Sequence, residues 1–271
     1  MLRVTRTMVT LGALQAAAWL VAIPPATPAY AESAQEILQR QRELHHVPDE
    51  TETLKMTMVN KNGETKEREV VRDTITGPDN LSKILIRFTA PRDVQGTGML
   101  IWEKADGDDD QWLYLPAMRK VKRIAASGKK NRFMGTDFAY EDLSPESLRA
   151  NTYTLVGNET IDGAECWVVE AVPASEAYAA DSGYSKRKLW IRQDNYVTVK
   201  REYYDKQGKL EKVQDDRKFS KVAETAWRSD EVEMRDVQAG TKTIFVTQGH
   251  KIAQGLSDDR FSLTELEEGA E

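Results

Sequence analysis

The feature that most constrains the fold of this chain is a series of turn dipeptides, spaced at short intervals between runs of strand-forming residues. Asn62-Gly63 and Asp162-Gly163 are two of them, and such pairs favour tight hairpin turns because both residues tolerate positive φ. No βαβ alternation and no repeat of fixed period interrupts the pattern, so it predicts a mainly β protein built on a single antiparallel sheet. The expected strands span residues 54–59, 66–71, 81–88, 98–102, 112–115, 121–124, 153–156, 166–172, 188–192, 197–204, 210–219, 227–237 and 241–250.

The hydrophobic pattern within these strands indicates that the sheet is curved. Residues 231–235 alternate charged and apolar side chains, as strands do when one face of the sheet meets water. Other strands are instead apolar on both faces: Ile84, Ile86 and Phe88 alternate with Leu85, and residues 112–115 are apolar throughout. We therefore expect a curved sheet with helices packed against its hollow side. A helix over residues 33–45 and a short one beginning at Ser144 are the candidates.

Residues 1–31 have the parts of a secretory signal. Arg3 and Arg6 give a positive start, an uncharged apolar stretch follows, and Ala29-Tyr30-Ala31 is a small-x-small cleavage site. We therefore expect an exported domain over residues 32–271 that is soluble after cleavage. The alternative is an uncleaved membrane anchor, but the apolar stretch is shorter than the ~20 residues that a membrane span requires.

Composition limits the class of partner. The full chain has a formal net charge of −6, and loss of Arg3 and Arg6 with the signal would leave −8. This charge disfavours binding to nucleic acid. Cys166 is the only cysteine, so no internal disulfide can form and the hydrophobic core alone must stabilise the domain.

No motif in the sequence nominates a catalytic or metal site. HExxH, CxxC, GxSxG and P-loop patterns are all missing. The acidic loop at residues 106–110 lacks the alternating acids and the final Glu of a calcium-binding loop, so an acidic hairpin tip explains it better. We expect no cofactor, no metal and no enzymatic activity.

A cationic cluster is unusual in so acidic a chain. An exposed strand and loop would explain it without any function; a rim that contacts anionic headgroups or an acidic partner is the functional alternative. The residues are Arg119, Lys120, Lys122, Arg123, Lys129, Lys130 and Arg132.

Three runs around this cluster carry a family resemblance. They are GTGMLIW at residues 96–102, WLYLPAMRKVKRI at 112–124 and RFMGTDFAYEDL at 132–143. They resemble the outer-membrane lipoprotein-sorting family, the LolA-like periplasmic carriers, and more narrowly the branch found beside large inner-membrane transporters of the RND type. The resemblance implies an open half-barrel with a few helices covering its concave face, and a cavity between sheet and helices that holds acyl chains. This chain is longer than the best-understood carriers, which leaves the cargo open: a lipoprotein, another lipid, or a hydrophobic transporter substrate.

The function that the resemblance implies is a carrier that binds the acyl chains of a lipid or lipoprotein and moves them toward the outer membrane. Its partners would be an inner-membrane transporter, an outer-membrane acceptor and, transiently, the membrane surface. The alternative is an adaptor or sensor for such a transporter that carries no cargo; an enzyme acting on lipid or envelope polymer has no residue to support it. The apolar candidates for the cavity or its cover are Leu100, Ile101, Trp102, Trp112, Leu113, Tyr114, Leu115, Phe133, Met134 and Phe138.

Overall fold

The structure, a computed structural model, describes residues 1–2 and 32–269. Contacts divide the chain into two units, residues 1–31 and residues 32–271. The expected signal segment lies, apart from its first two residues, outside the described residues, so the signal and its cleavage stay predictions. Within the described ranges, no helix combines the length and the hydropathy that crossing a membrane would require.

The second unit is mainly β, as the turn pattern predicts, and a strand is present at each of the thirteen expected positions. The strands are β1 (Asp49–Val59), β2 (Thr65–Thr76), β3 (Ser82–Ala90), β4 (Gly98–Trp102), β5 (Asp110–Leu115), β6 (Lys120–Arg123), β7 (Asn151–Ile161), β8 (Ala164–Pro173), β9 (Lys186–Arg192), β10 (Thr198–Tyr204), β11 (Leu210–Lys221), β12 (Trp227–Asp236) and β13 (Thr241–Ile252). The helices are α1 (Ala34–Leu44), α2 (Glu176–Asp181) and α3 (Leu263–Glu268), with 3-10 turns η1 (Pro116–Met118), η2 (Ala126–Gly128), η3 (Tyr140–Leu143) and η4 (Asp258–Phe261).

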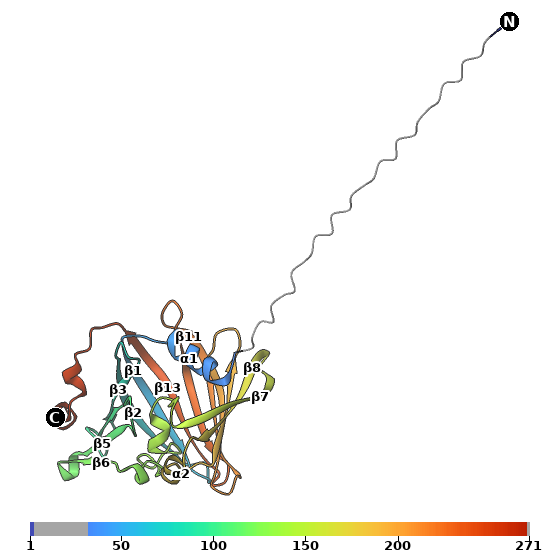
Figure 1. The fold of residues 1–271 in the computed structure, drawn as a ribbon. Helices are drawn as coiled ribbons and strands as arrows, with labels where there is room; N and C mark the ends of the chain where they lie inside the picture. Colours follow the sequence, from blue (N-terminus) through green and yellow to red (C-terminus); the bar gives the residue numbers. More distant parts are fainter. Residues whose placement is uncertain (3–31, 270–271) are drawn as a thin grey trace. The chain divides into compact units, whose positions relative to one another are not determined.

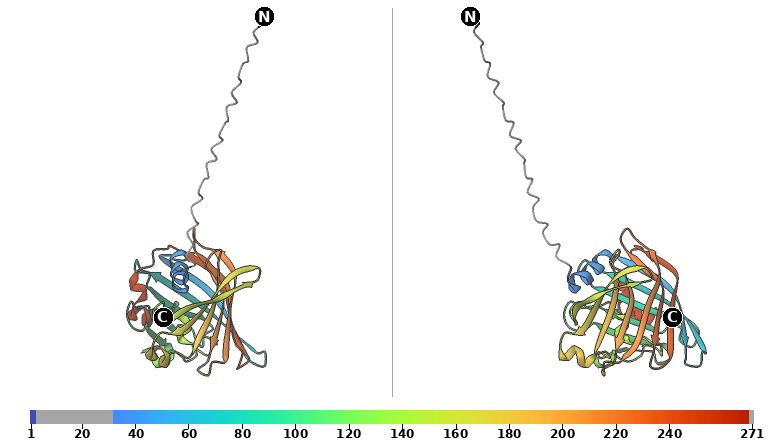
Figure 2. Two further views of the ribbon diagram at one scale, coloured as in Figure 1. Left: turned by 45° about the vertical axis from the view of Figure 1, so that its right-hand side comes forward. Right: turned by 90° about the vertical axis from the view of Figure 1, so that its right-hand side faces the viewer.

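All thirteen strands form one antiparallel sheet that curls but does not close (Figures 1 and 2). Strands β1 to β6 form one meander, strands β7 to β13 form a second, and the pairing of β1 with β13 joins them. Strands β6 and β7 are therefore neighbours in sequence but lie at opposite edges of the sheet. Residues 124–150, the crossing segment, must connect these two edges.

Local sequence explains where the elements turn and begin. Asp162 and Gly163 both have positive φ, 48° and 82°, and they join β7 to β8 as a two-residue hairpin of the kind that this dipeptide favours. Ser33 caps α1 through a capping box with Glu36, each supplying a side-chain acceptor for the other's backbone N–H.

The crossing segment packs on one face of the sheet, which we call the inner face. Its Phe133 and Tyr140 are buried in an apolar cluster with strand residues such as Met56, Val70 and Ile86. Helix α1 also covers this side, with Ile37 buried against β8 and β9. The interior of the half-barrel is thus closed by α1 and by the crossing segment with its 3-10 turns.

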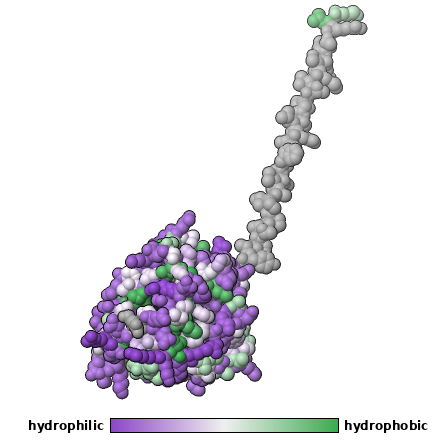
Figure 3. Space-filling model, turned by 90° about the vertical axis from the view of Figure 1, so that its left-hand side faces the viewer, coloured by the Kyte–Doolittle hydropathy of each residue, from purple (hydrophilic) through white to green (hydrophobic). Residues whose placement is uncertain are grey.

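The C-terminal elements η4 and α3 pack on the opposite, outer face, over β3 to β5. Phe261 and Leu266 are buried there, and the Trp102 indole donates a hydrogen bond of 2.8 Å to the Phe261 carbonyl. Gly98 permits the close contact, because a Cβ at this position would lie 2.8 Å from Leu266 Cδ1. Figure 3 views the side that holds these elements and shows mostly hydrophilic residues, with apolar ones in small groups.

The predicted helix at Ser144 is wrong. The 3-10 turn η3 ends there, and Ser144 is extended, with φ −79° and ψ 152°. Gln111 Nε2 donates to the Tyr140 carbonyl and to Ser144 Oγ, at 3.0 and 3.1 Å, and Arg187 binds Glu146. These tertiary contacts hold the chain extended over the sheet and outweigh the local helix-starting signal.

Candidate functional site

A cavity of about 310 Å³ lies between the inner face and the crossing segment. A more open hollow of about 420 Å³ adjoins it beneath α1. Residues 142–146 line both spaces, as do Arg72 and Arg201. The cavity alone reaches the lower end of the size range typical of ligand sites, roughly 300–1,000 Å³.

One wall of the cavity is apolar. It combines side chains from β1 to β3, from β12 and β13, and from the crossing segment: Leu54, Met56, Val70, Ile86, Val232, Phe245, Phe133 and Phe138. The phenylalanines of the crossing segment contact both halves of the sheet. The Phe133 ring lies 5.7 Å from that of Phe88, and the Phe138 ring lies 5.2 Å from that of Phe245.

The other wall, which we call the polar wall, is lined by arginine–carboxylate pairs. Arg187 Nη2 lies 2.8 Å from Glu146 Oε1, and Arg201 Nη1 lies 2.8 Å from Asp216 Oδ2. Two further pairs join Arg72 to Glu52 and Arg228 to Glu50. Such pairing is what permits charge in so enclosed a space, since an unpaired buried charge is costly.

Electrostatic interactions keep Glu50 and Arg201 ionised. Burial would raise the pKa of Glu50, but its hydrogen bond with His250 and the charges of Arg228 and Arg72 outweigh burial and lower the pKa to about 2. Burial likewise opposes the charged form of Arg201, but the charge of Asp216 raises the pKa of this guanidinium. Both groups are therefore charged at neutral pH.

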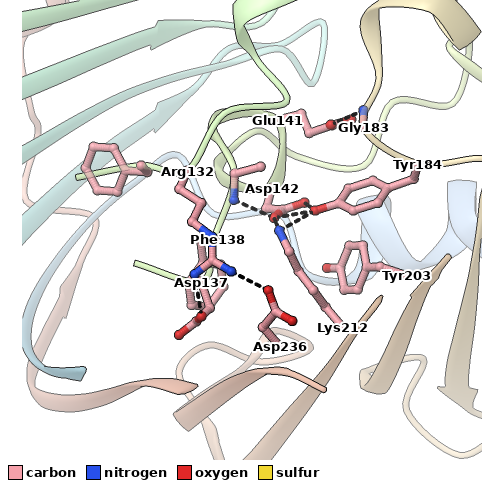
Figure 4. A network of polar contacts seen from close by, with 12 residues as sticks. Arg132, Asp137, Phe138, Glu141, Asp142, Gly183, Tyr184, Tyr203, Lys212 and Asp236 are labelled. Carbon is pink, nitrogen blue, oxygen red and sulfur yellow. Dashed lines mark hydrogen bonds and ion pairs between the residues drawn. The ribbon is translucent and has the colours of Figure 1, made fainter. Parts of the chain in front are cut away.

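A network of ion pairs and hydrogen bonds, which we call the latch, joins the crossing segment to β12 and β13 (Figure 4). Arg132 bridges Asp137, at 2.9 Å, and Asp236. Asp137 in turn accepts hydrogen bonds from Thr241 and Thr243. Because Asp137 and Asp236 are buried, these contacts place the segment firmly over the second half of the sheet.

A second group of contacts joins residues 141–142 of the crossing segment to β11 and to the loop before β9. The Tyr184 hydroxyl donates to Asp142 at 2.9 Å and accepts from Lys212 Nζ at 2.9 Å, and Glu141 accepts from the Gly183 N–H at 2.7 Å (Figure 4). Burial, together with the charge of Asp142, raises the pKa of both Tyr184 and Glu141. The Tyr184 phenol therefore remains a hydrogen-bond donor at all ordinary pH values.

The ten apolar residues predicted to form the cavity or its cover lie on both faces of the sheet. Phe133 and Phe138 line the cavity. Ile101 and Leu113 are buried in the inner-face cluster without lining the cavity, and Leu115 and Met134 are partly buried against it. The remaining four lie on the outer face, in or beside the cluster around α3: Leu100, Trp102, Trp112 and Tyr114.

The basic residues also divide into two groups. Arg123 pairs with Asp110, Lys129 lies 4.0 Å from Asp108, and Arg132 belongs to the latch. The others are exposed and form no ion pair with any described residue: Arg119, Lys120, Lys122 and Lys130. The first three lie at the open edge of the sheet beside Met118, whose surface is 60% exposed.

Sequence reasoning missed the polar wall altogether. Its residues come mainly from the second half of the chain, away from the motif runs. A signal was present, because Arg201 and Arg187 stand at alternate positions with the buried Tyr203 and Leu189. A charged residue in register with apolar neighbours marks a charge that faces the interior. No cluster of His, Cys, Asp and Glu within residues 1–2 and 32–269 is arranged to hold a metal.

Comparisons with known proteins identify the family. A protein domain from Vibrio parahaemolyticus, assigned to outer membrane lipoprotein sorting, is 31% identical with a TM-score of 0.82; the match covers 86% of this chain and 98% of that one. The chain belongs to the LolA-like lipoprotein-sorting family. A family model described as an uncharacterized protein also matches residues 80–268.

Two further structures agree with a LolA-like fold. A DUF1329 family protein from Desulfovibrio piger is 28% identical with a TM-score of 0.80, over 86% of this chain and 97% of that one. A LolA superfamily protein from Nitrosomonas europaea is 19% identical with a TM-score of 0.68, over 87% and 100%, and supports the fold alone. No curated protein matches the chain.

Proposed function

We propose that residues 32–271 form a periplasmic carrier that binds an acyl chain beneath the crossing segment and moves it toward the outer membrane. The observation that carries this proposal is the cavity between the inner face and residues 124–150, with its apolar wall around Met56, Phe133 and Phe245. Membership of the LolA-like family supports it, as does the secretory pattern of residues 1–31.

The energetics explain why such a carrier needs no catalytic group. Each methylene that leaves a membrane for water costs ~0.8 kcal/mol, so a chain of roughly 16 carbons desorbs slowly by itself. A cavity that shelters the chain removes most of that cost. Loading then requires an inner-membrane partner, for which we propose an RND-type transporter, and release requires an outer-membrane acceptor.

The free basic edge supplies a surface for such contacts. Arg119, Lys120 and Lys122 lie together on β6 and its preceding turn, without ion pairs among the described residues. We propose that this edge meets anionic headgroups or an acidic partner surface during loading. The same edge is the observation that favours the second candidate, an adaptor that docks on a transporter but carries nothing.

Lipid transfer between vesicles tests the proposal. Donor vesicles with a fluorescent, acyl-labelled lipid and unlabelled acceptor vesicles are mixed with the exported chain. A carrier accelerates transfer in proportion to protein concentration, and blocking the cavity abolishes the acceleration. An adaptor binds the vesicles without changing the transfer rate, and that result would refute the carrier.

A further inference from the structure

The polar wall contains charged groups that a carrier of plain hydrocarbon does not need. Four guanidinium groups and their carboxylates line the cavity or the hollow beside it. Replacing paired charges in an interior by apolar side chains is often neutral or stabilising, so stability does not account for them. The hydrogen-bonding capacity of each group indicates what the wall can recognise.

The carboxylates are largely satisfied by the protein itself. Asp216 accepts from Arg201 at 2.8 Å and from Gln214 at 2.7 Å. Glu146 accepts two bonds from Arg187 and one from the Tyr153 hydroxyl. Both oxygens of each of these acids are therefore already hydrogen-bonded within the protein.

The guanidinium of Arg201, by contrast, has donors to spare. It carries five N–H groups, and among the described residues only one of them, on Nη1, donates a hydrogen bond within the protein. The arginines are also the accessible members of their pairs. The Arg201 side chain is 24% exposed against 10% for Asp216, and the Arg72 side chain 39% against 3% for Glu52. The wall therefore presents unused N–H donors to the cavity.

From this excess of donors, and building on the proposed carrier function, we infer that the cavity binds a single-chain amphiphile with an oxyanion head, a carboxylate or a phosphate. The head would take the free N–H groups of Arg201, with Arg72 as a second donor, because planar guanidinium groups match such oxygens. The hydrocarbon would lie on the apolar wall around Met56, Phe133 and Phe245.

The size of the cavity fits one chain of moderate length. A cavity of about 150 Å³ accommodates benzene, with its six carbons. The 310 Å³ found here therefore has room for about twelve carbons of one chain. A longer chain would extend into the adjoining hollow beneath α1.

The test compares three probes that share a C12 chain: dodecanoate, dodecyl phosphate and dodecanol. Binding of each to the exported, delipidated chain is measured by calorimetry. We expect at least one of the two oxyanion probes to bind at least tenfold more tightly than dodecanol, and its identity tells a fatty-acid head from a phosphate head. Equal binding of all three would overturn the inference while leaving the carrier intact. Failure of all three to bind would count against the carrier itself.

Paired variants assign the preference to the polar wall. Arg201→Gln with Asp216→Asn removes both charges of one pair and should reduce the oxyanion preference to less than threefold, with dodecanol binding unchanged. The matched control is Lys200→Gln with Glu202→Gln, an ion pair at 2.7 Å on the same strand that faces the outer side beside Trp190. It should keep the full preference.

A preference that persists unchanged in the Arg201 variant would contradict the assignment to that residue. If that variant does not fold, as judged by circular dichroism, Arg72→Gln with Glu52→Gln replaces it. If the Arg72 variant loses the oxyanion preference, recognition by the polar wall is supported. If it keeps the preference, recognition by the polar wall is overturned.

Discussion

Filling the cavity with one side chain is the sharpest test of lipid binding. Val232, on β12, lines the cavity, and Val232→Trp would place an indole in it. The matched control is Val246→Trp on the adjacent strand β13. Val246 is 38% exposed and pairs with Glu231, the neighbour of Val232, so the two substitutions are the same chemical change on opposite faces of one part of the sheet.

The expected loss follows from the surface that an indole occupies. A tryptophan side chain covers roughly 150–250 Å², whereas one methylene accounts for about 30 Å² at ~25 cal/mol per Å². Allowing for the valine that it replaces, the indole should displace about four methylenes of a bound chain. At ~0.8 kcal/mol each, the loss is about 3 kcal/mol, or about two orders of magnitude in Kd.

Displacement of a fluorescent fatty-acid analogue measures this loss. We expect Val232→Trp to weaken binding about a hundredfold and Val246→Trp to leave it within twofold of the unaltered chain. Thermal unfolding of both variants checks that the sheet is intact. Unchanged affinity in a folded Val232→Trp protein would show that the acyl chain binds elsewhere, and the reasoning from the cavity would fail.

Three other predictions concern stability and docking. Phe133→Ala should lower the free energy of unfolding by about 3–5 kcal/mol, measured with denaturant, because Phe133 is buried; a loss below 1 kcal/mol would mean that the crossing segment does not pack as described. Glu50, with its pKa lowered from 4.5 to about 2, contributes stability that is complete above its ordinary pKa and is lost as pH falls toward 2. This amounts to about 3 kcal/mol, and Glu50→Gln should remove that part of the pH dependence; an identical pH profile would refute it. Reversing the basic edge should weaken association with anionic vesicles several-fold at low salt, as followed by co-sedimentation, whereas reversing three exposed lysines elsewhere should weaken it less; equal effects would make the edge passive. The edge variant is Arg119→Glu, Lys120→Glu and Lys122→Glu, and its control is Lys209→Glu, Lys221→Glu and Lys251→Glu.

The local pattern was sufficient to predict the sheet but not its topology. Turn dipeptides such as Asp162-Gly163 set the strand boundaries, because backbone conformation there depends on the residues themselves. Nothing local says that β6 and β7 lie at opposite edges. The crossing segment that covers the cavity could therefore be recognised as distinctive in sequence, but its position could not be predicted.

The sequence likewise could not predict which face of each apolar strand is turned toward the interior. Residues 98–102 and 112–115 contain no charged side chain, so alternation cannot say which side meets the interior. In the structure Leu113 faces the inner cluster, whereas Trp112 and Tyr114 face α3. The choice depends on where the C-terminal helix packs, which is a tertiary property.

Native mass spectrometry of residues 32–271, purified without detergent, is the most direct test of lipid binding in the cavity. We expect a fraction of the protein at the mass of the chain plus one acyl-bearing molecule; organic extraction should release this molecule, and Val232→Trp should abolish its binding. Bare protein in every preparation, with no adduct when the delipidated chain is offered a C12 amphiphile, would contradict the claim that the cavity shelters hydrocarbon.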